Sequence, residues 1–403
     1  MSKGNRTVLM LLALVALSAC TSQTVKKVNT VQVSKADQEL SQDALLDIGI
    51  VVFHPGVEDI QEEPGKDNVY SQVRKAEARY IPYVLRTTLE SSNQWGAVRV
   101  LPENDPASEI EVTGRIVESD GVELKVEVRA VDSTGRVWLD KEYEDLATQF
   151  AYRDDIDYNG DAFQDLYNRV SNDLAAYRAR LKPEQLRMIR TVASLKYAAE
   201  LSPEAFGSHI NVDQRSGKVV INRLPSDRDP MLARVNRIRE SEYLFVDTVD
   251  QQYAAFFREM DPSYDQWRRF SYEETLAMQD VKRSARTRAL AGLLGIAGGA
   301  AISGNANNSA MRQVGNAAAL GGLYAVKQSF DTFQQAKIHE EALKELAASF
   351  DSEVQPIVLE VEGEVVKLNG SLESQYSEWR RLLREIYSAE VGLPATDRVP
   401  QTQ

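Results

Sequence analysis

The chain contains one cysteine, Cys20, and its position near the start suggests covalent chemistry. Before it lies an uncharged apolar stretch, residues 8–17, which Lys3 and Arg6 precede. A basic start, a short apolar core and small residues at the end of that core are the order of a secretory signal. About ten apolar residues are too few for a spanning helix, which needs roughly 20. We therefore expect residues 1–19 to direct export and then to be removed as a signal peptide.

The residues Leu17-Ser18-Ala19-Cys20 resemble the lipobox of bacterial lipoproteins. The resemblance implies diacylglycerol on the Cys20 sulfur, cleavage before that residue, and acylation of the new amino group, for example with palmitate. Two or more acyl chains anchor a protein stably to a membrane. Thr21 stands where an aspartate tends to retain enterobacterial lipoproteins in the inner membrane, so the resemblance implies the outer membrane and a periplasmic orientation. The alternative is an ordinary signal peptide whose cysteine is incidental.

An acidic segment at 155–161 is the second candidate for chemistry. Asp155, Asp157 and Asn159 place side-chain oxygens at positions one, three and five of a calcium loop, with glycine at position six. Position twelve, which in such loops is a bidentate glutamate, is Leu166. We favour an acidic turn that caps the following helix, with weak calcium binding as the alternative. No other metal and no cofactor is expected.

Few other residues suggest catalysis. The sequence holds no serine nucleophile elbow, no paired-histidine zinc motif and no phosphate-binding loop of the common kinds. The three histidines, His54, His209 and His339, have no convincing partners, although His54 follows a predicted strand and precedes Pro-Gly. Because Cys20 is the only cysteine, no disulfide forms within one chain and no cysteine metal site exists. We expect no enzyme.

Composition excludes one class of partner. The chain has 47 Lys and Arg against 60 Asp and Glu, a formal net charge of −13. Removal of the signal, which holds two basic and no acidic residues, makes the charge −15. A nucleic-acid-binding protein would show a basic surface, so nucleic acid is not expected as a partner. A hydrophobic content of 43% is enough for packed cores, and 403 residues suggest two or three structural units.

The elements that must position any site begin after a polar stretch, residues 20–43, which is expected to be a lipidated flexible tether. Residues 44–146 are predicted to form a small α/β domain. Its strands are expected at 46–53, 96–101, 110–116, 122–130 and 137–143, and its helix at 68–92, with a kink or division at Pro82. The last three strands form an antiparallel meander. One face of it is apolar and the other charged, so one face should carry helices and the other should meet water.

This order of elements resembles the small periplasmic α/β domain of curli-secretion lipoproteins, the amino-terminal domain of TolB, and penicillin-binding-protein activator lipoproteins. Gly114-Arg-Ile116 and the segment from Val131 to Trp138 carry the resemblance. It covers residues 44–146 and implies a fold, while it transfers no active residues.

Residues 147–288 are predicted to be mainly helical. The expected helices lie at about 160–206 and resume from about 228, with a break at Asp261-Pro262. A short hairpin is expected at 210–224, turning at 215–217. The many aromatic residues between 243 and 272 are expected to pack in a core.

Residues 289–327 are predicted to form a helical hairpin with small residues at every fourth position. Such stripes let helix backbones approach closely, above all in lipid. The segment resembles the glycine-zipper segments of outer-membrane-associated lipoproteins. Three alternatives stay open: association with a membrane, a soluble hairpin buried in an oligomer or domain interface, and a mobile loop. The stripe residues are Ala291, Gly295, Gly299, Ser303, Ala317, Gly321 and Ala325.

Residues 328–390 are expected to form a helix and a small α/β unit, with strands near 356–361 and 365–368 and a helix at 375–386, followed by a disordered tail at 391–403. The fold class is therefore α+β. The expected function is that of a non-catalytic outer-membrane lipoprotein. It would act in envelope assembly, maintenance or secretion by contacting envelope proteins, and would form a homo-oligomer. The alternatives are a homo-oligomeric membrane pore or secretion-channel component, and a hydrolase of cell wall or polysaccharide.

Overall fold

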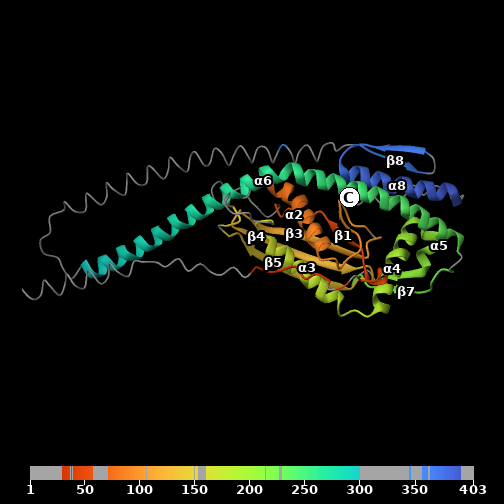
Figure 1. Ribbon diagram of the computed structural model, residues 1–403, viewed down its shortest axis with the longest axis horizontal. Helices are drawn as coiled ribbons and strands as arrows, with labels where there is room; N and C mark the ends of the chain where they lie inside the picture. The colour runs from red at the N-terminus through yellow and green to blue at the C-terminus, as the bar shows by residue number, and fades with distance from the viewer. Residues whose placement is uncertain are drawn as a thin grey trace, which may run out of the picture. The chain divides into compact units, whose positions relative to one another are not determined.

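The computed structural model describes twelve stretches of the chain, and the described residues from Gln32 onward belong to one compact unit. The described residues are 30–36, 38, 40–57, 71–105, 107–148, 150–152, 160–213, 215–226, 229–299, 345, 356–361 and 364–391. They combine one five-stranded sheet, two short hairpins and several helices (Figure 1), so the fold is α+β, as the sequence predicts.

The central sheet has the order β2-β1-β3-β4-β5. Strand β1 lies between β2 and β3 and is parallel to both, whereas β3, β4 and β5 form an antiparallel meander. All five strands lie where the sequence predicts them. They are β1 (Ile48–Val51), β2 (Val98–Leu101), β3 (Ile110–Ser119), β4 (Glu123–Asp132) and β5 (Val137–Leu146). The 3-10 turn η2 (Gln42–Ala44) precedes β1.

Buried and more exposed residues alternate along β3 and β4, so the two faces of the sheet differ. Val112 on β3 pairs with Ala130 on β4, and both side chains are buried on the face that packs against α2 (Ser71–Ser91) and α3 (Gln164–Arg178). Over β3, β4 and β5 the opposite face is open and charged, and Arg115, Glu127 and Arg129 line a groove of about 500 Å³ there. The expectation of one helix-covered and one water-facing side is confirmed for the meander.

Helix α2 is continuous through Pro82, so the predicted division of this helix is wrong, while the alternative of a kink stays a prediction. Proline removes one backbone hydrogen bond. Here the residues around it compensate, because Ile81, Val84 and Leu85 are buried and Tyr80 packs on Phe257 and Tyr264 of α6.

Beyond the sheet lie α4 (Pro183–Leu201), α5 (Pro203–Phe206) and the 3-10 turn η3 (Gly207–His209). Pro183 starts α4 at a position where a helix needs no backbone N–H. The strands β6 (Ile210–Val212) and β7 (Val219–Ile221) then form the predicted short antiparallel hairpin.

The element with the greatest consequence is α6, which runs without a break from Pro230 to Gly299 (Figure 1). The predicted break at Asp261-Pro262 is wrong. Met260 and Tyr264, on either side of the proline, are both buried, and the Asp261 carboxylate accepts a hydrogen bond from the Tyr80 hydroxyl at 2.7 Å. These contacts with α2 hold the helix together where the proline removes a hydrogen bond. At about 1.5 Å per residue, its 70 residues extend for roughly 105 Å.

The carboxyl-terminal elements pack on α6. Strands β8 (Ile357–Val361) and β9 (Glu364–Leu368) form the predicted antiparallel pair, and α8 (Leu372–Val391) follows. Trp379 of α8 is fully buried and stacks on Phe245 of α6 with ring centroids 5.0 Å apart. None of the helices in the described part of the chain combines the length and apolar composition that a bilayer crossing requires.

Candidate functional site

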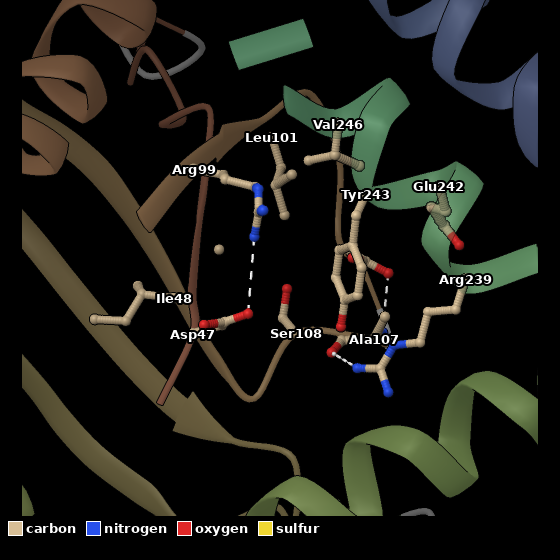
Figure 2. A pocket seen from close by; sticks show the side chains of 12 residues that line it. Asp47, Ile48, Arg99, Leu101, Ala107, Ser108, Arg239, Glu242, Tyr243 and Val246 are labelled. Atoms are coloured by element: carbon tan, nitrogen blue, oxygen red, sulfur yellow. Dashed lines mark hydrogen bonds and ion pairs between the residues drawn. The ribbon is translucent and has the colours of Figure 1, made fainter. Parts of the chain in front are cut away.

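A small, partly open cavity lies where α6 crosses the edge of the sheet beside β2 (Figure 2). Arg239, Glu242 and Tyr243 reach it from α6, and Arg99 reaches it from β2. Asp105 comes from the loop between β2 and β3. The cavity measures about 30 Å³, enough for about two water molecules.

Helix periodicity explains why the Glu242 carboxyl group lies at this cavity. Val235, Ile238, Phe245 and Val249 form the buried stripe of α6, and Glu242 lies on the same stripe at helical spacing. Folding of the helix onto the sheet therefore buries this carboxylate, and its exposed fraction is only 2%.

Neighbouring charges hold the cavity wall in place. The Arg99 guanidinium contacts Asp247 at 2.6 Å and Asp47 at 3.8 Å. Arg239 donates to the Ala107 carbonyl at 3.2 Å (Figure 2). Both guanidinium groups lie 5.3 Å from the centre of the Tyr243 ring. These contacts tie α6 to β2 and to the loop that leads into β3.

Glu242 also lines a second cavity, of about 10 Å³, together with Tyr197 of α4 and Arg380 of α8. We call Glu242, Asp105, Tyr197 and Arg380 the Glu242 site. Among the described residues, no donor makes a hydrogen bond of regular geometry to either Glu242 carboxylate oxygen, although the Tyr197 hydroxyl interacts with the carboxylate and opposes the rise of its pKa. Burial and the Asp105 charge raise the Glu242 pKa to about 7, against the opposing effect of Arg380. The carboxyl group therefore takes up or releases its proton near neutral pH.

Arg380 connects the site to α8. Its guanidinium pairs with Glu200 of α4 and lies 3.9 Å from an Asp105 oxygen. Burial alone would lower the Arg380 pKa, but the Glu200 and Glu242 charges outweigh it and raise that pKa. The Tyr197 hydroxyl faces Glu242, and burial together with the Glu242 charge raises its pKa. Three helices and one loop thus meet around one proton-binding carboxyl group.

No protein-family model and no curated protein matches this sequence. The chemistry of the Glu242 site therefore follows from its own geometry. Pockets for organic ligands measure about 300–1,000 Å³, far more than the two cavities here. Within the described ranges, no group of three or more histidine, cysteine or acidic side chains could hold a metal ion. The site can store a proton and hold helices together, and it has no room for an organic substrate.

A second buried ionic network joins α6 to α2. Arg268 lies 2.7 Å from the carboxylate of Asp161, and its guanidinium carbon lies 4.4 Å from the centre of the Tyr264 ring. Glu77 accepts hydrogen bonds from the hydroxyls of Tyr264 and Ser119, each at 2.7 Å. Burial raises the Glu77 pKa, against the charge of nearby Arg74. This network holds α6 in place beyond Pro262.

The predicted site residues fall in two groups. Cys20 lies outside the described residues, as do Asp155, Asp157 and Asn159 of the calcium candidate and Ser303, Ala317, Gly321 and Ala325 of the small-residue stripe. Ala291, Gly295 and Gly299 lie on α6, in one continuous helix with the packed core. Asp161, just after the calcium candidate, accepts a hydrogen bond from the Phe163 backbone N–H at 2.9 Å, immediately before α3.

The two described histidines, His54 and His209, each contact a backbone group through the ring Nδ1 atom. His54 Nδ1 accepts a hydrogen bond from the Gly56 N–H at 3.1 Å and lies 3.4 Å from Arg115 Nη1. His209 Nδ1 lies 3.1 Å from the Arg223 carbonyl oxygen, at the base of the β6–β7 hairpin. His339 lies outside the described residues.

Sequence reasoning missed the Glu242 site. One signal could have found its central residue, because an acid on the apolar stripe of a helix must be buried when that stripe packs. Asp105 and Arg380 carry no such signal, since both are ordinary charged residues in distant parts of the chain.

Proposed function

We propose that this chain is a non-catalytic lipoprotein of the outer membrane, anchored through acyl chains on Cys20 and facing the periplasm. Its role is that of an accessory factor in envelope assembly, maintenance or secretion, exerted through contacts with envelope proteins. No cofactor takes part. One observation supports this most directly: α6 is a single helix that begins in the packed core and ends in the glycine-rich segment.

That continuity has a mechanical consequence. Residues 230–268 of α6 are held by the Glu242 site and by the Arg268 network, so the helix is attached firmly to the sheet. The same helix carries Ala291, Gly295 and Gly299 at four-residue spacing. A stripe of small residues favours close helix pairing. Pairing of this segment with a partner helix would therefore be transmitted to the folded body.

The buried charges support a structural role rather than catalysis. Arg268 is engaged with Asp161, and Arg380 is engaged with Glu200. The cavities beside Glu242 hold only a few water molecules. Such groups stabilise the packing of α6, α4 and α8 in the described part of the chain.

A homo-oligomeric pore or secretion-channel component is the second candidate, and the same helix continuity favours it. The test compares the detergent-extracted mature protein with a variant lacking residues 289–326. We expect the wild type to form an oligomer and the deletion variant to be monomeric, because the small-residue stripe supplies the pairing surface. Sedimentation in detergent measures this, and a wild type that sediments as a monomer contradicts the oligomer.

Two further measurements separate the candidates. Ion conductance of the wild-type oligomer in planar bilayers would favour the pore over the accessory factor. Chemical crosslinking in cells should capture the same envelope proteins reproducibly with the wild type and lose them with the deletion variant. Failure to capture any envelope protein with the wild type would contradict the accessory role.

A further inference from the structure

The β6–β7 hairpin carries charge of the opposite sign to the rest of the chain. Residues 178–226 hold nine Lys or Arg against four Asp or Glu, in a protein whose net charge is −13. Between 210 and 224 there are three basic residues and one acid, Asp213. The Asp213 carboxylate accepts hydrogen bonds from the backbone N–H groups of Arg215 and Ser216, at 3.0 and 2.8 Å. That acid therefore holds the turn together.

Aliphatic side chains are exposed among these cations. Val220 is 59% exposed, Leu224 is 63% exposed and Val212 is 37% exposed. Large aliphatic residues clustered at the surface mark contact sites more often than scattered ones do. We call six exposed residues the hairpin surface: Arg215, Lys218, Arg223, Val212, Val220 and Leu224.

The hairpin is held at its base by η3 and near its turn by the loop between β4 and β5. The Val219 N–H donates to the Thr134 carbonyl at 3.0 Å, and the Asn222 N–H donates to the His209 carbonyl at 2.8 Å. His209 is buried and packs against the Phe206 ring. At the turn, the Gly217 backbone packs on Gly135, where a Cβ atom would lie 2.1 Å from the Gly217 carbonyl oxygen. The hairpin surface is thus presented on a supported element.

Both faces of the hairpin offer aliphatic groups. Val212 pairs with Val219 across the two strands, so these two residues share a face, and Val220 points to the opposite face. A groove on a protein partner would cover one face only. A fluid surface can accept aliphatic groups from both faces while its headgroups meet the cations between them. The hairpin surface therefore suits a lipid bilayer better than it suits an acidic protein.

We propose that the hairpin surface is a membrane contact site for anionic phospholipid. Its three cations bind the phosphate headgroups, and its aliphatic side chains enter the interfacial region. Exposed cations and inserted apolar groups are the two contributions that hold peripheral segments at anionic membranes. This contact does not depend on acylation of Cys20, and it gives the folded body a preferred side toward the bilayer.

The test uses the chain without its first 20 residues, which carries no acyl group and keeps the compact unit from Gln32 onward. Cosedimentation is measured at about 0.1 M salt with vesicles of phosphatidylcholine, with or without a third of phosphatidylglycerol. We expect binding to the anionic vesicles only. R215Q/K218Q/R223Q should weaken this binding at least tenfold, because each cation near an anionic surface contributes to it. V220S/L224S should weaken it several-fold.

The matched control is R129Q/K141Q/R381Q. It removes three exposed cations from other surfaces and makes the same change in net charge. This control should bind as the wild type does. Equal losses in both triple variants would overturn the proposal, as would absence of binding to anionic vesicles. Loss with the charge variant but not with V220S/L224S would also overturn it, because it would indicate general recognition of acidic groups, including acidic proteins.

Tryptophan fluorescence tests insertion of the hairpin surface directly, without relying on a variant that loses binding. The four native tryptophans, Trp95, Trp138, Trp267 and Trp379, are all buried. A Val220→Trp variant therefore adds one exposed tryptophan, whose emission should shift to the blue when anionic vesicles are added. The wild type should show no such shift. An unchanged emission maximum in the variant contradicts insertion of the hairpin surface.

Discussion

Glu242 is a buried glutamate whose pKa is raised above the ordinary value for this residue type. An isolated carboxylate is costly to bury, and it avoids that cost by keeping its proton. The Glu242 pKa of about 7 lies above the ordinary value of 4.5, so the folded chain binds this proton more tightly than the unfolded chain does. Glu242 therefore stabilises the fold at low pH. That contribution is lost as the pH rises from about 4.5 to about 7.

Glu242→Gln tests this consequence. The amide is neutral at every pH, so we expect the variant to match the wild type near pH 5 and to be more stable at pH 8. The difference at pH 8 should be at most about 3 kcal/mol. Urea unfolding at both pH values measures it. Glu240→Gln, at an exposed position on the same helix, is the control and should leave the pH dependence unchanged. A stability difference that does not change with pH would contradict the proton assignment.

At the scale of elements, strand β3 depends on a close approach that only glycine permits. A Cβ atom at Gly114 would lie 2.5 Å from a carbon of the Phe53 ring. Phe53 is itself buried, and its backbone N–H donates to the Ala78 carbonyl of α2 at 2.9 Å. Gly114 therefore lets the chain after β1 pack tightly between β3 and α2.

Gly114→Ala should lower the free energy of unfolding by about 1–3 kcal/mol, because the ring cannot move away without shifting the core. Phe53→Leu added to that variant should recover part of the loss by making room. Gly207→Ala is the control, since a Cβ atom there meets nothing within 4 Å. Urea unfolding measures all three variants. If Gly114→Ala were as stable as the wild type, the packing at β3 would have to be looser than described.

Two prolines show how packing overrides local preference. The structure places Pro82 inside α2 and Pro262 inside α6 without dividing either helix. A proline in a helix interior costs about 3 kcal/mol relative to alanine. The buried side chains on either side of each proline offset that cost in the packed chain. The residue type alone therefore predicts breaks that the whole structure does not make.

At the scale of the whole molecule, membrane attachment is expected to combine a covalent and a surface contribution. One acyl chain binds a membrane marginally, whereas two signals together hold it stably. In our proposals Cys20 carries the lipid, and the hairpin surface orients the body. The acidic remainder of the chain favours a single contact side, because the other surfaces would be repelled by anionic lipid.

Cys20→Ala should abolish incorporation of labelled palmitate, because the thiol is the first attachment point in the proposed modification. The variant should also keep its first 19 residues and migrate above the mature chain, since cleavage follows acylation of that cysteine. Thr21→Ala, the neighbouring substitution, should retain both label and cleavage. Continued labelling of Cys20→Ala would place the lipid elsewhere or exclude it.

Short-range patterns were enough to predict most of the elements. Alternation of Val126 and Val128 with charged neighbours predicted β4, and the expected meander predicted its antiparallel pairing with β3. The small hairpin at 210–224 and the helix that became α8 were also found from local spacing. These signals work because strand and helix periods are properties of a few consecutive residues.

The sequence by itself determined the α+β class, the five strands of the sheet and the expectation of a lipidated Cys20. Only the tertiary structure decided that α6 runs unbroken through Pro262, and only it brought Asp105, Glu242 and Arg380 together. The physical reason is that a charged residue reveals its environment only when distant elements pack around it. The pKa of Glu242 depends on its burial and on neighbours from other elements, none of which a local pattern contains.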